Sequence, residues 1–361
     1  MNKKYMKIAI DLAKKGKGKV NPNPLVGAVI VKNEKIIAEG YHMVYGEAHA
    51  EVNAFNNATC DVEGATMYVT LEPCSHFGKT PPCADKIIEK KIKRVVIGSL
   101  DPNPLVAGNG IKKLKEAGIE VEAGVLESEC NELNEVFMKY IVSKKPFVVM
   151  KCAMSLDGKI ATSYGESKWI TGEASRGDVH ETRNELSGIM VGVNTVIKDN
   201  PELTCRIENG RNPVRIIVDS TLRIPLESKV VTEVYKAKTI IATTKKASED
   251  KIKILEDKGV TILIVNLKND KVDLNDLMIK LGELKIDSIL LEGGATLNFS
   301  ALDEGIVDKV QMYIAPKIIG GEMSKTPVGG NGIEALKDAY KLRNLTTRVL
   351  GDDILIEGYI E

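Results

Sequence analysis

Four residues in the first quarter of the chain have the types and the order of a zinc site. His49 is followed two positions later by Glu51, and Cys74 and Cys83 lie downstream in the stretch YVTLEPCSHFGKTPPC. Zinc prefers imidazole nitrogen and thiolate sulfur, and a catalytic zinc keeps three protein ligands and leaves one position for water. We therefore predict that zinc is bound by His49, Cys74 and Cys83. Glu51 would lie beside the bound water and carry protons without being a ligand.

The order of these residues matches a known signature of zinc deaminases, His-x-Glu followed by Pro-Cys-x-x-Cys. Here eight residues, SHFGKTPP, separate the cysteines where the signature has two. We expect this longer segment to form part of the pocket wall. His76 lies within it and could supply a fourth ligand, which would close the site to water. A single histidine or buried cysteine is more often structural, so the prediction depends on the joint order.

The predicted secondary structure places these side chains at the ends of elements. In the first half we expect strands at 25–31, 35–40, 66–71, 94–99 and 119–125, and helices at 5–16, 48–58, 82–92, 110–118 and 128–142. This alternation predicts an α/β fold with a mostly parallel sheet covered by helices. The positive end of a helix dipole favours a thiolate at a helix start. His49 and Glu51 can face one site only at the mouth of a helix, because residues two apart do not share a face.

The second half repeats the alternation after a proline at 146, which predicts a domain boundary near Lys145 and domains of 1–145 and 146–361. Its expected strands are 147–155, 185–193, 213–220, 238–244, 260–266, 286–294 and 309–319, and its last residues predict a hairpin turning at 351–353. The strand 286–294 ends in Glu292-Gly293-Gly294, where a helix start could receive a phosphate. The sequence has no G-x-G-x-x-G motif, which argues against a standard Rossmann site.

Composition narrows the class of protein further. A chain of 361 residues with 43% apolar residues can form two ordinary cores. Fifty basic residues balance fifty acidic ones, so no net charge attracts nucleic acid or an anionic membrane. The apolar stretch LVGAVIV is too short to span a bilayer. Six scattered cysteines suggest no disulfide framework, and we expect a cytoplasmic protein with neither a nucleic-acid nor a membrane partner.

Longer motifs resemble those of a known family. NPNPLVGAV, HAE, TLEPCSHFGKTPPC and DPNPLVAG are similar to the deaminase half of the bifunctional pyrimidine deaminase/reductase of riboflavin biosynthesis. SLDGKIAT, SKWITG, GVNTVIKDNPELTCR, VDSTLRIP, LEGGATL and YIAPKIIGG are similar to its reductase half. The resemblance covers essentially the whole chain, with no motif residue replaced. It implies a cytidine-deaminase-like domain followed by a dihydrofolate-reductase-like domain.

The resemblance also implies two reactions on a pyrimidine ribonucleotide. The first is zinc-dependent hydrolytic deamination of a phosphoribosylated diaminopyrimidinone, and the second is NADPH-dependent reduction of the ribosyl group of the product to ribityl. By position, the substrate contacts would be Asn23, His42, Lys79, Ser167, Arg183, Leu203, Arg206 and Glu292. The NADPH contacts would be Ala153, Trp169, Thr195, Asp199, Ser220, Gly294, Ala295, Thr296, Leu297, Asn298, Phe299 and Ser300. Arginines suit a substrate phosphate, and Ser220 is expected on the adenosine side of NADPH.

Two other classes of protein could use such a zinc site. A nucleic-acid base deaminase with a non-catalytic C-terminal domain would show the short cysteine spacing and a basic face, whereas this chain has neither the spacing nor a net charge. A non-enzymatic pyrimidine-binding protein with structural zinc would need neither Glu51 nor an open ligand position. We favour the bifunctional enzyme, and we expect it to be a homo-oligomer.

Overall fold

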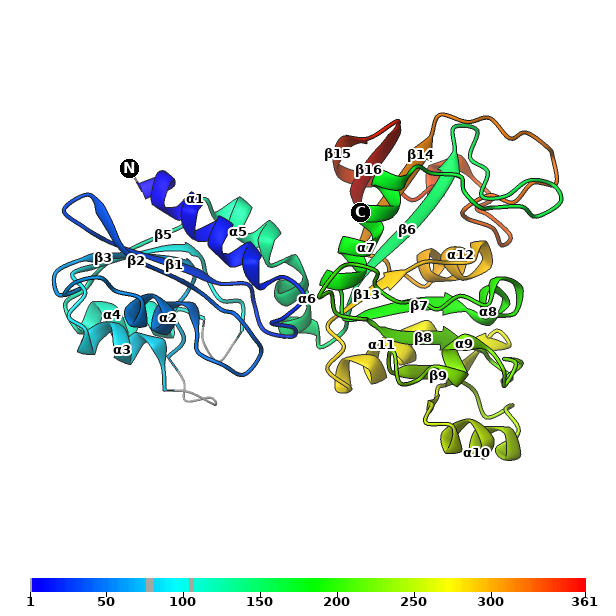
Figure 1. The fold of residues 1–361 in the computed structure, drawn as a ribbon, viewed down its shortest axis with the longest axis horizontal. Helices are drawn as coiled ribbons and strands as arrows, with labels where there is room; N and C mark the ends of the chain where they lie inside the picture. Colours follow the sequence, from blue (N-terminus) through cyan, green and yellow to red (C-terminus); the bar gives the residue numbers. More distant parts are fainter. Residues whose placement is uncertain (1, 76–80, 104–106) are drawn as a thin grey trace. The chain divides into compact units, whose positions relative to one another are not determined.

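The computed structural model describes residues 2–75, 81–103 and 107–361. The chain forms two compact units, Met1–Lys144 and Lys145–Glu361, and each has its own sheet (Figure 1). None of the helices in these described ranges has the length and apolar character needed to cross a bilayer.

The first unit has a five-stranded sheet between two layers of helices. Its strands are β1 (Gly27–Lys32), β2 (Lys35–Tyr41), β3 (Thr66–Leu71), β4 (Arg94–Ser99) and β5 (Glu120–Ala123), in the order β2-β1-β3-β4-β5. Its α-helices are α1 (Asn2–Ala13), α2 (Ala50–Asn56), α3 (Cys83–Glu89), α4 (Asn109–Glu116), α5 (Glu127–Leu133) and α6 (Glu135–Ser143). Helices α1 and α5 pack on one face of the sheet, and α2, α3 and α4 pack on the other (Figure 1).

The prediction of a mostly parallel sheet is wrong for this unit. Strand β1 pairs antiparallel with both β2 and β3, and only the β3–β4 and β4–β5 pairs are parallel. The reason is local: Asn33 and Glu34, which join β1 to β2, both have positive φ values, 50° and 62°. Two such residues form the tight turn of an antiparallel hairpin.

The single helix expected over 128–142 is also wrong, since the structure has α5 and α6 with a break at Asn134. This residue leaves the helical conformation, with φ of −113°. Its side chain accepts a hydrogen bond from the Leu25 backbone N–H (2.8 Å) and donates one to the Leu25 carbonyl (3.0 Å). The break therefore anchors the loop before β1, which carries Asn23.

The second unit has a nine-stranded sheet in the order β10-β9-β8-β7-β13-β6-β14-β16-β15. Its strands are β6 (Phe147–Ser155), β7 (Gly188–Gly192), β8 (Val214–Val218), β9 (Thr239–Thr243), β10 (Thr261–Ile264), β13 (Ser288–Leu291), β14 (Lys309–Ala315), β15 (Leu342–Leu350) and β16 (Asp353–Ile360). In this spatial order, every neighbouring pair from β10 through β9, β8, β7, β13 and β6 to β14 is parallel, as predicted. Within this sheet only β14–β16 and β15–β16 are antiparallel. A small separate hairpin is formed by β11 (Leu267–Lys268) and β12 (Lys271–Val272).

Helices cover both faces of this sheet. The α-helices are α7 (Glu173–Glu185), α8 (Val193–Asp199), α9 (Lys229–Thr232), α10 (Glu249–Asp257), α11 (Leu274–Glu283) and α12 (Ala295–Asp303). Helices α11 and α12 pack against one face, and α8, α9 and α10 pack against the other. The C-terminal hairpin is confirmed, but its turn is shorter than expected, because Asp353 already pairs with Leu350 in the β15–β16 ladder.

Gly27 offers a direct test of how α1 packs on β1. A Cβ atom on Gly27 would lie 2.0 Å from the Ala9 carbonyl oxygen and 2.9 Å from the Ala13 nitrogen. We expect Gly27→Ala to destabilise the first unit by about 1–3 kcal/mol, because helix and strand must move apart. Gly177→Ala in α7 is the matched control, since a Cβ there would meet nothing within 4 Å. Equal denaturation midpoints for Gly27→Ala and the wild type would contradict this packing.

Candidate functional site

The three predicted zinc ligands meet at the ends of three elements. His49 is the N-cap of α2, Cys74 follows the end of β3, and Cys83 is the first residue of α3. The His49 Nδ1 atom lies 3.2 Å from Cys83 Sγ and 3.6 Å from Cys74 Sγ. All three donor atoms lie within 4.8 Å of one another. The structure therefore brings together the three side chains that the sequence predicts as zinc ligands.

This donor set fits a zinc ion. Bond lengths of about 2.3 Å to sulfur and about 2.0 Å to nitrogen, at tetrahedral angles, separate sulfur from nitrogen by roughly 3.6 Å. Cys74 Sγ also accepts a hydrogen bond from the Cys83 backbone N–H (3.3 Å). The hydrogen bond with the Cys83 thiol lowers the pKa of Cys74 well below its ordinary value, and it raises the pKa of Cys83. One thiolate is thus favoured before any metal binds.

Glu51 is the second residue of α2, two positions after the N-cap His49. Both side chains therefore reach the site. Only 3% of the Glu51 surface is exposed. Burial raises the pKa of its carboxyl group above the ordinary value, and the charge of Cys74 acts in the same direction. A raised pKa makes a carboxylate a stronger proton acceptor, and the carboxyl group can afterwards return the proton. The geometry therefore suits a proton carrier beside the metal.

His42 and Asn23 form a hydrogen-bonded pair at the same pocket. His42 Nδ1 lies 3.0 Å from the Ala48 carbonyl oxygen, which can only accept, and Nε2 lies 3.2 Å from Asn23 Nδ2. Burial lowers the pKa of His42, which agrees with a neutral ring that donates through Nδ1 and accepts through Nε2. The pair is thus fixed in orientation and presents the Asn23 amide toward the pocket.

The pocket has a volume of about 340 Å³, and Asn23, His42, His49, Glu51 and Cys74 all line it. Asp101 and Asn103 line it too. They belong to DPNPLVAG, which, like NPNPLVGAV, is one of the motifs that resemble the deaminase half of the family. Asn23 lies in the same pocket as Asp101 and Asn103, because β1 is antiparallel to β3 and begins at the edge where the parallel strands β3 and β4 end. Lys79 and His76 lie outside the described residues.

Glu72 is a buried residue that sequence reasoning missed. Its carboxylate accepts hydrogen bonds from the backbone N–H groups of Gly108 (3.0 Å), Gly110 (3.0 Å) and Ile111 (3.3 Å). These groups lie at the N-terminus of α4, where the helix leaves its own donors unpaired. Glu72 therefore holds α4 beside the end of β3, two residues before Cys74. Its place inside the motif TLEPC was the available signal.

A second and larger pocket, of about 1050 Å³, lies at the carboxyl edge of the nine-stranded sheet. Most of the predicted cofactor and substrate residues line it: Ser167, Thr195, Asp199, Ser220, Glu292, Gly294, Ala295, Thr296, Leu297, Phe299 and Ser300. Gly294 is the N-cap of α12, and a Cβ there would lie 3.6 Å from Thr195 Oγ1. A wide pocket with a glycine at a helix start fits a phosphate-bearing nucleotide such as NADPH.

Three other predicted residues, Asn298, Ala153 and Trp169, are not part of this lining. Asn298 is buried and donates to the Pro327 carbonyl oxygen (2.8 Å), so it anchors the loop opposite α12. Ala153 packs beside the core of Val179, Tyr313 and Leu355. Trp169 is 60% exposed, with the Arg176 guanidinium 4.7 Å from its ring centroid.

Arg183 and Glu292 form a buried ion pair. Arg183 donates from Nε to Glu292 Oε1 (2.6 Å) and from Nη2 to Oε2 (2.9 Å), and Lys151 Nζ lies 4.0 Å from Oε2. Burial would raise the pKa of Glu292, but the charges of Arg183 and Lys151 outweigh it and hold the pKa at about 2. Because three of the five Arg183 N–H groups donate to Glu292 and to the Thr204 carbonyl (2.9 Å), the exposed Arg206 is the better candidate for a phosphate contact.

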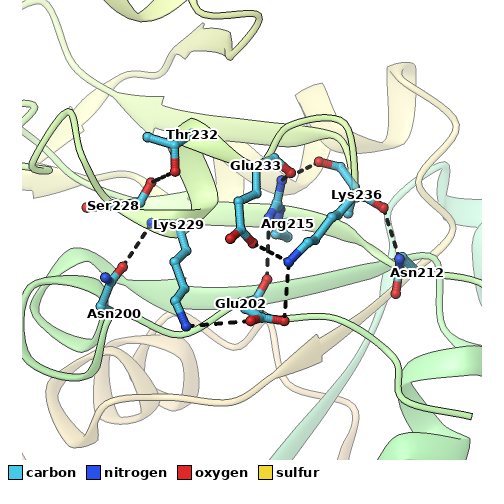
Figure 2. Close-up of polar contacts among 10 residues, drawn as sticks. Asn200, Glu202, Asn212, Arg215, Ser228, Lys229, Thr232, Glu233 and Lys236 are labelled. Atoms are coloured by element: carbon cyan, nitrogen blue, oxygen red, sulfur yellow. Dashed lines mark hydrogen bonds and ion pairs between the residues drawn. The ribbon is translucent and has the colours of Figure 1, made fainter.

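The segment that carries Leu203 and Arg206 is held by a polar network around the buried Arg215 (Figure 2). Arg215, fully buried on β8, donates to the carbonyl oxygens of Glu202 (3.4 Å) and Glu233 (2.9 Å) and to that of Ala237. Asn200 Oδ1 accepts from the Lys229 N–H, and Asn212 Oδ1 accepts from the Cys205 N–H, both at 2.8–2.9 Å. This network places Leu203 and Arg206 on a rigid support that motif comparison does not reveal.

Comparison with known proteins agrees with this division of the chain. A family model described as the RibD C-terminal domain matches residues 146–356, and one described as the cytidine and deoxycytidylate deaminase zinc-binding region matches residues 1–99. The riboflavin biosynthesis protein RibD of Actinobacillus pleuropneumoniae is 55% identical over 355 residues, which cover 98% of this chain and 94% of the relative.

Two solved structures match the whole chain. Acinetobacter baumannii RibD, form 1, has a TM-score of 0.89 at 37% identity, covering 100% of this chain and 99% of that chain. A diaminohydroxyphosphoribosylaminopyrimidine deaminase/5-amino-6-(5-phosphoribosylamino)uracil reductase from Thermotoga maritima has a TM-score of 0.86 at 41% identity, with the same coverage.

Fold, sites and matches together define a zinc-dependent deaminase joined to an NADPH-dependent reductase. Both domains have the predicted folds, cytidine-deaminase-like first and dihydrofolate-reductase-like second. The chain belongs to the RibD family of riboflavin biosynthesis and is a bifunctional enzyme. A nucleic-acid deaminase with a non-catalytic C-terminal domain and a non-enzymatic zinc protein are thereby excluded.

Arg215 gives a test of the network in Figure 2. Arg215→Met keeps much of the side-chain volume but removes the donor of three carbonyl groups, of which that of Ala237 is in a buried hydrogen bond. We expect the second unit to lose about 1–3 kcal/mol of unfolding free energy, the cost of an unsatisfied buried group. Arg348→Met is the control, because that side chain is 49% exposed in its ion pairs and should change stability by less than about 1 kcal/mol. Equal losses in both variants would contradict the assigned role.

Proposed function

We propose that the unit Met1–Lys144 deaminates 2,5-diamino-6-(5-phosphoribosylamino)pyrimidin-4-one and that the unit Lys145–Glu361 reduces the ribosyl group of the product, 5-amino-6-(5-phosphoribosylamino)uracil, to ribityl. The Thermotoga maritima relative carries the names of both activities. The observation that carries the proposal is the convergence of His49, Cys74 and Cys83 beside the buried Glu51, in a pocket formed within one unit. The larger pocket is formed wholly within the other unit.

In the deaminase, Glu51 accepts a proton from the attacking water and returns it to the leaving amino group. Zinc at His49, Cys74 and Cys83, when bound, would supply a polarised water of low pKa. Burial of Glu51 favours this exchange because it raises the pKa of the carboxyl group and so makes the carboxylate a stronger proton acceptor. Asn23 orients the pyrimidine by hydrogen bonds of its amide group, and the neutral His42 holds Asn23 in place and contacts the substrate with its ring. Asp101 and Asn103 complete the wall of the pocket.

In the reductase, the ribonucleotide lies near Glu292, with Ser167, Arg183 and Leu203 around it and Arg206 on its phosphate. The Arg183–Glu292 pair keeps the Glu292 carboxylate charged and fixed. NADPH, when bound, supplies the hydride. Its pyrophosphate would lie at the N-terminus of α12, between Thr195 and the residues from Gly294 to Ser300, and its adenosine near Ser220. Ala153, Trp169 and Asp199 complete the proposed cofactor contacts.

The exposed β15 edge supports a homo-oligomer. All residues of β15 from Arg343 to Val349 are exposed, including Leu345 at 59% and Val349 at 75%. A long exposed edge strand with apolar side chains is a pairing surface unless something covers it, and a second copy of the chain would do so. All six cysteines are free thiols, which suits the reducing cytoplasm as the site of action.

Glu51→Gln separates the two activities. The amide is isosteric but cannot accept the proton, so we expect zinc content to be kept and deamination to fall by about 10²–10⁴-fold. Reduction of externally supplied 5-amino-6-(5-phosphoribosylamino)uracil, followed by NADPH absorbance, should stay at the wild-type rate. The measurements are metal analysis and the two separate rate assays.

Arg206→Ala is the converse variant. It should spare deamination and weaken reduction, because the substrate phosphate loses a charge-assisted contact. The proposal fails if zinc-loaded, folded Glu51→Gln deaminates normally, or if it no longer oxidises NADPH with the deaminated substrate.

A further inference from the structure

The loop 167–172 of the reductase is held in place by charged side chains. It directly precedes α7 and carries two predicted contacts, Ser167 for the substrate and Trp169 for NADPH. Lys317, in the loop after β14, donates from Nζ to the carbonyl oxygens of Trp169 (3.0 Å) and Ile170 (2.6 Å). One cation from a segment far along the chain therefore binds two adjacent carbonyl groups of this loop.

The rest of the loop is held in the same way. Arg176 of α7 donates from Nη1 to the Thr171 carbonyl oxygen (2.6 Å), and its guanidinium lies 4.7 Å from the centroid of the Trp169 ring. Asp353, the first residue of β16, accepts a hydrogen bond at Oδ2 from the Gly172 backbone N–H (2.7 Å). The carbonyl groups of three consecutive residues, 169–171, and the N–H group that follows them thus all bind charged side chains.

Asp353 supplies the cap that the sequence of α7 lacks. The N-cap is Gly172, which has no side chain to accept hydrogen bonds. In a capping box the third helical residue accepts from the N-cap N–H, but here that residue is Ser175, whose hydroxyl donates to Asp353 Oδ2 (2.6 Å). A Cβ atom on Gly351 would lie 3.5 Å from Ala174 Cβ. The tip of the β15–β16 hairpin therefore packs on the first turn of α7 and places a carboxylate at its positive end.

The backbone that carries Lys317 is itself fixed. The Leu156 backbone N–H donates to the Lys317 carbonyl oxygen (2.8 Å). One residue further, Asp157 accepts hydrogen bonds from the backbone N–H groups of Ile319 (3.0 Å) and Gly320 (2.7 Å). The Lys317 ammonium group therefore extends from a segment that is tied to the turn after β6.

These contacts fix a position more than they add stability. The loop lies at the surface, where Trp169 is 60% exposed and Lys317 is exposed as well. Water can satisfy exposed carbonyl groups, so a charged partner there contributes little to the free energy of unfolding. A loop that is already ordered, however, binds its ligands without first losing conformational entropy.

We propose that Lys317 and Asp353 are positioning residues of the reductase, which hold the loop 167–172 in the conformation that binds substrate and NADPH. The inference rests on the proposed contacts of Ser167 and Trp169. Neither Lys317 nor Asp353 needs to touch a reacting atom. Loss of either contact lowers the fraction of protein in the binding-competent conformation, which raises the apparent dissociation constants of the ligands and leaves the hydride step intact.

Steady-state kinetics of reduction tests this role. Lys317→Met keeps the length of the side chain and removes its donors. KM for supplied 5-amino-6-(5-phosphoribosylamino)uracil and for NADPH should rise about 10-fold, the factor that a hydrogen bond from a charged group contributes, while kcat stays within about threefold. Deamination and the midpoint of unfolding should not change. Lys317→Arg, which can donate to both carbonyl groups, should recover most of the loss.

Asp353→Asn tests the carboxylate with little risk to folding. The amide keeps an oxygen for both donors and removes only the charge at the start of α7. Both KM values should therefore rise by about 2- to 5-fold, the range expected for a charge at a helix terminus.

Tryptophan fluorescence reports on the loop without catalysis, because Trp169 is the only tryptophan of the chain. In the ligand-free protein, the fast component of its anisotropy decay should be larger in Lys317→Met than in the wild type and should return in Lys317→Arg. Lys280→Met is the matched control, since Lys280 donates to the Ile264 carbonyl oxygen (2.7 Å) away from this loop. It should change neither KM nor the anisotropy.

Equal KM values and equal anisotropy decays for Lys317→Met and Lys280→Met would overturn the proposal. A lower kcat at unchanged KM would overturn it too, because a purely structural defect removes folded enzyme without weakening the binding of ligands to the rest. A wild-type chain that oxidises no NADPH with the deaminated substrate would instead contradict the proposed function. The anisotropy comparison would then still decide whether Lys317 orders the loop.

Discussion

Both sites of this protein depend on parallel strands that end together at one edge of a sheet. In the first unit, β3 and β4 deliver Cys74 and Asp101 to one pocket, and the mouths of α2 and α3 add His49, Glu51 and Cys83. In the second unit, β7, β8 and β13 deliver Thr195, Ser220 and Glu292 to another. Functional side chains that lie far apart in the sequence become neighbours because the strands that carry them pair side by side and end at the same edge.

Buried charges paired with backbone groups keep these edges rigid. Glu72 accepts hydrogen bonds from the free N–H groups of α4, and Arg215 donates hydrogen bonds to backbone carbonyl groups beside the substrate segment. A buried charge is stable only when its hydrogen-bonding capacity is satisfied. Each of these residues thus fixes a loop beside a pocket, and none of them needs to touch a reacting atom.

The sequence predicted what depends on local pattern and on motif order. The strands of the second unit, the helix starts at His49 and Cys83 and the convergence of His49, Cys74 and Cys83 follow from periodicity, capping positions and residue chemistry. It did not predict the break at Asn134, where two hydrogen bonds to Leu25 outweigh helix propensity, or the antiparallel β1–β2 pair, which depends on two positive φ angles. It also missed Glu72 and Arg215, since their partners are backbone atoms that carry no sequence signal.

Zinc K-edge X-ray absorption on the protein reconstituted with one equivalent of zinc tests the central claim, a three-ligand site open to water. The account predicts two sulfur ligands at about 2.3 Å, one imidazole nitrogen at about 2.0 Å and one further light atom without the outer-shell scattering of an imidazole ring. A second imidazole, as would result from ligation by His76, or fewer than two sulfurs would contradict it, because the site would then be closed to water or built from other residues.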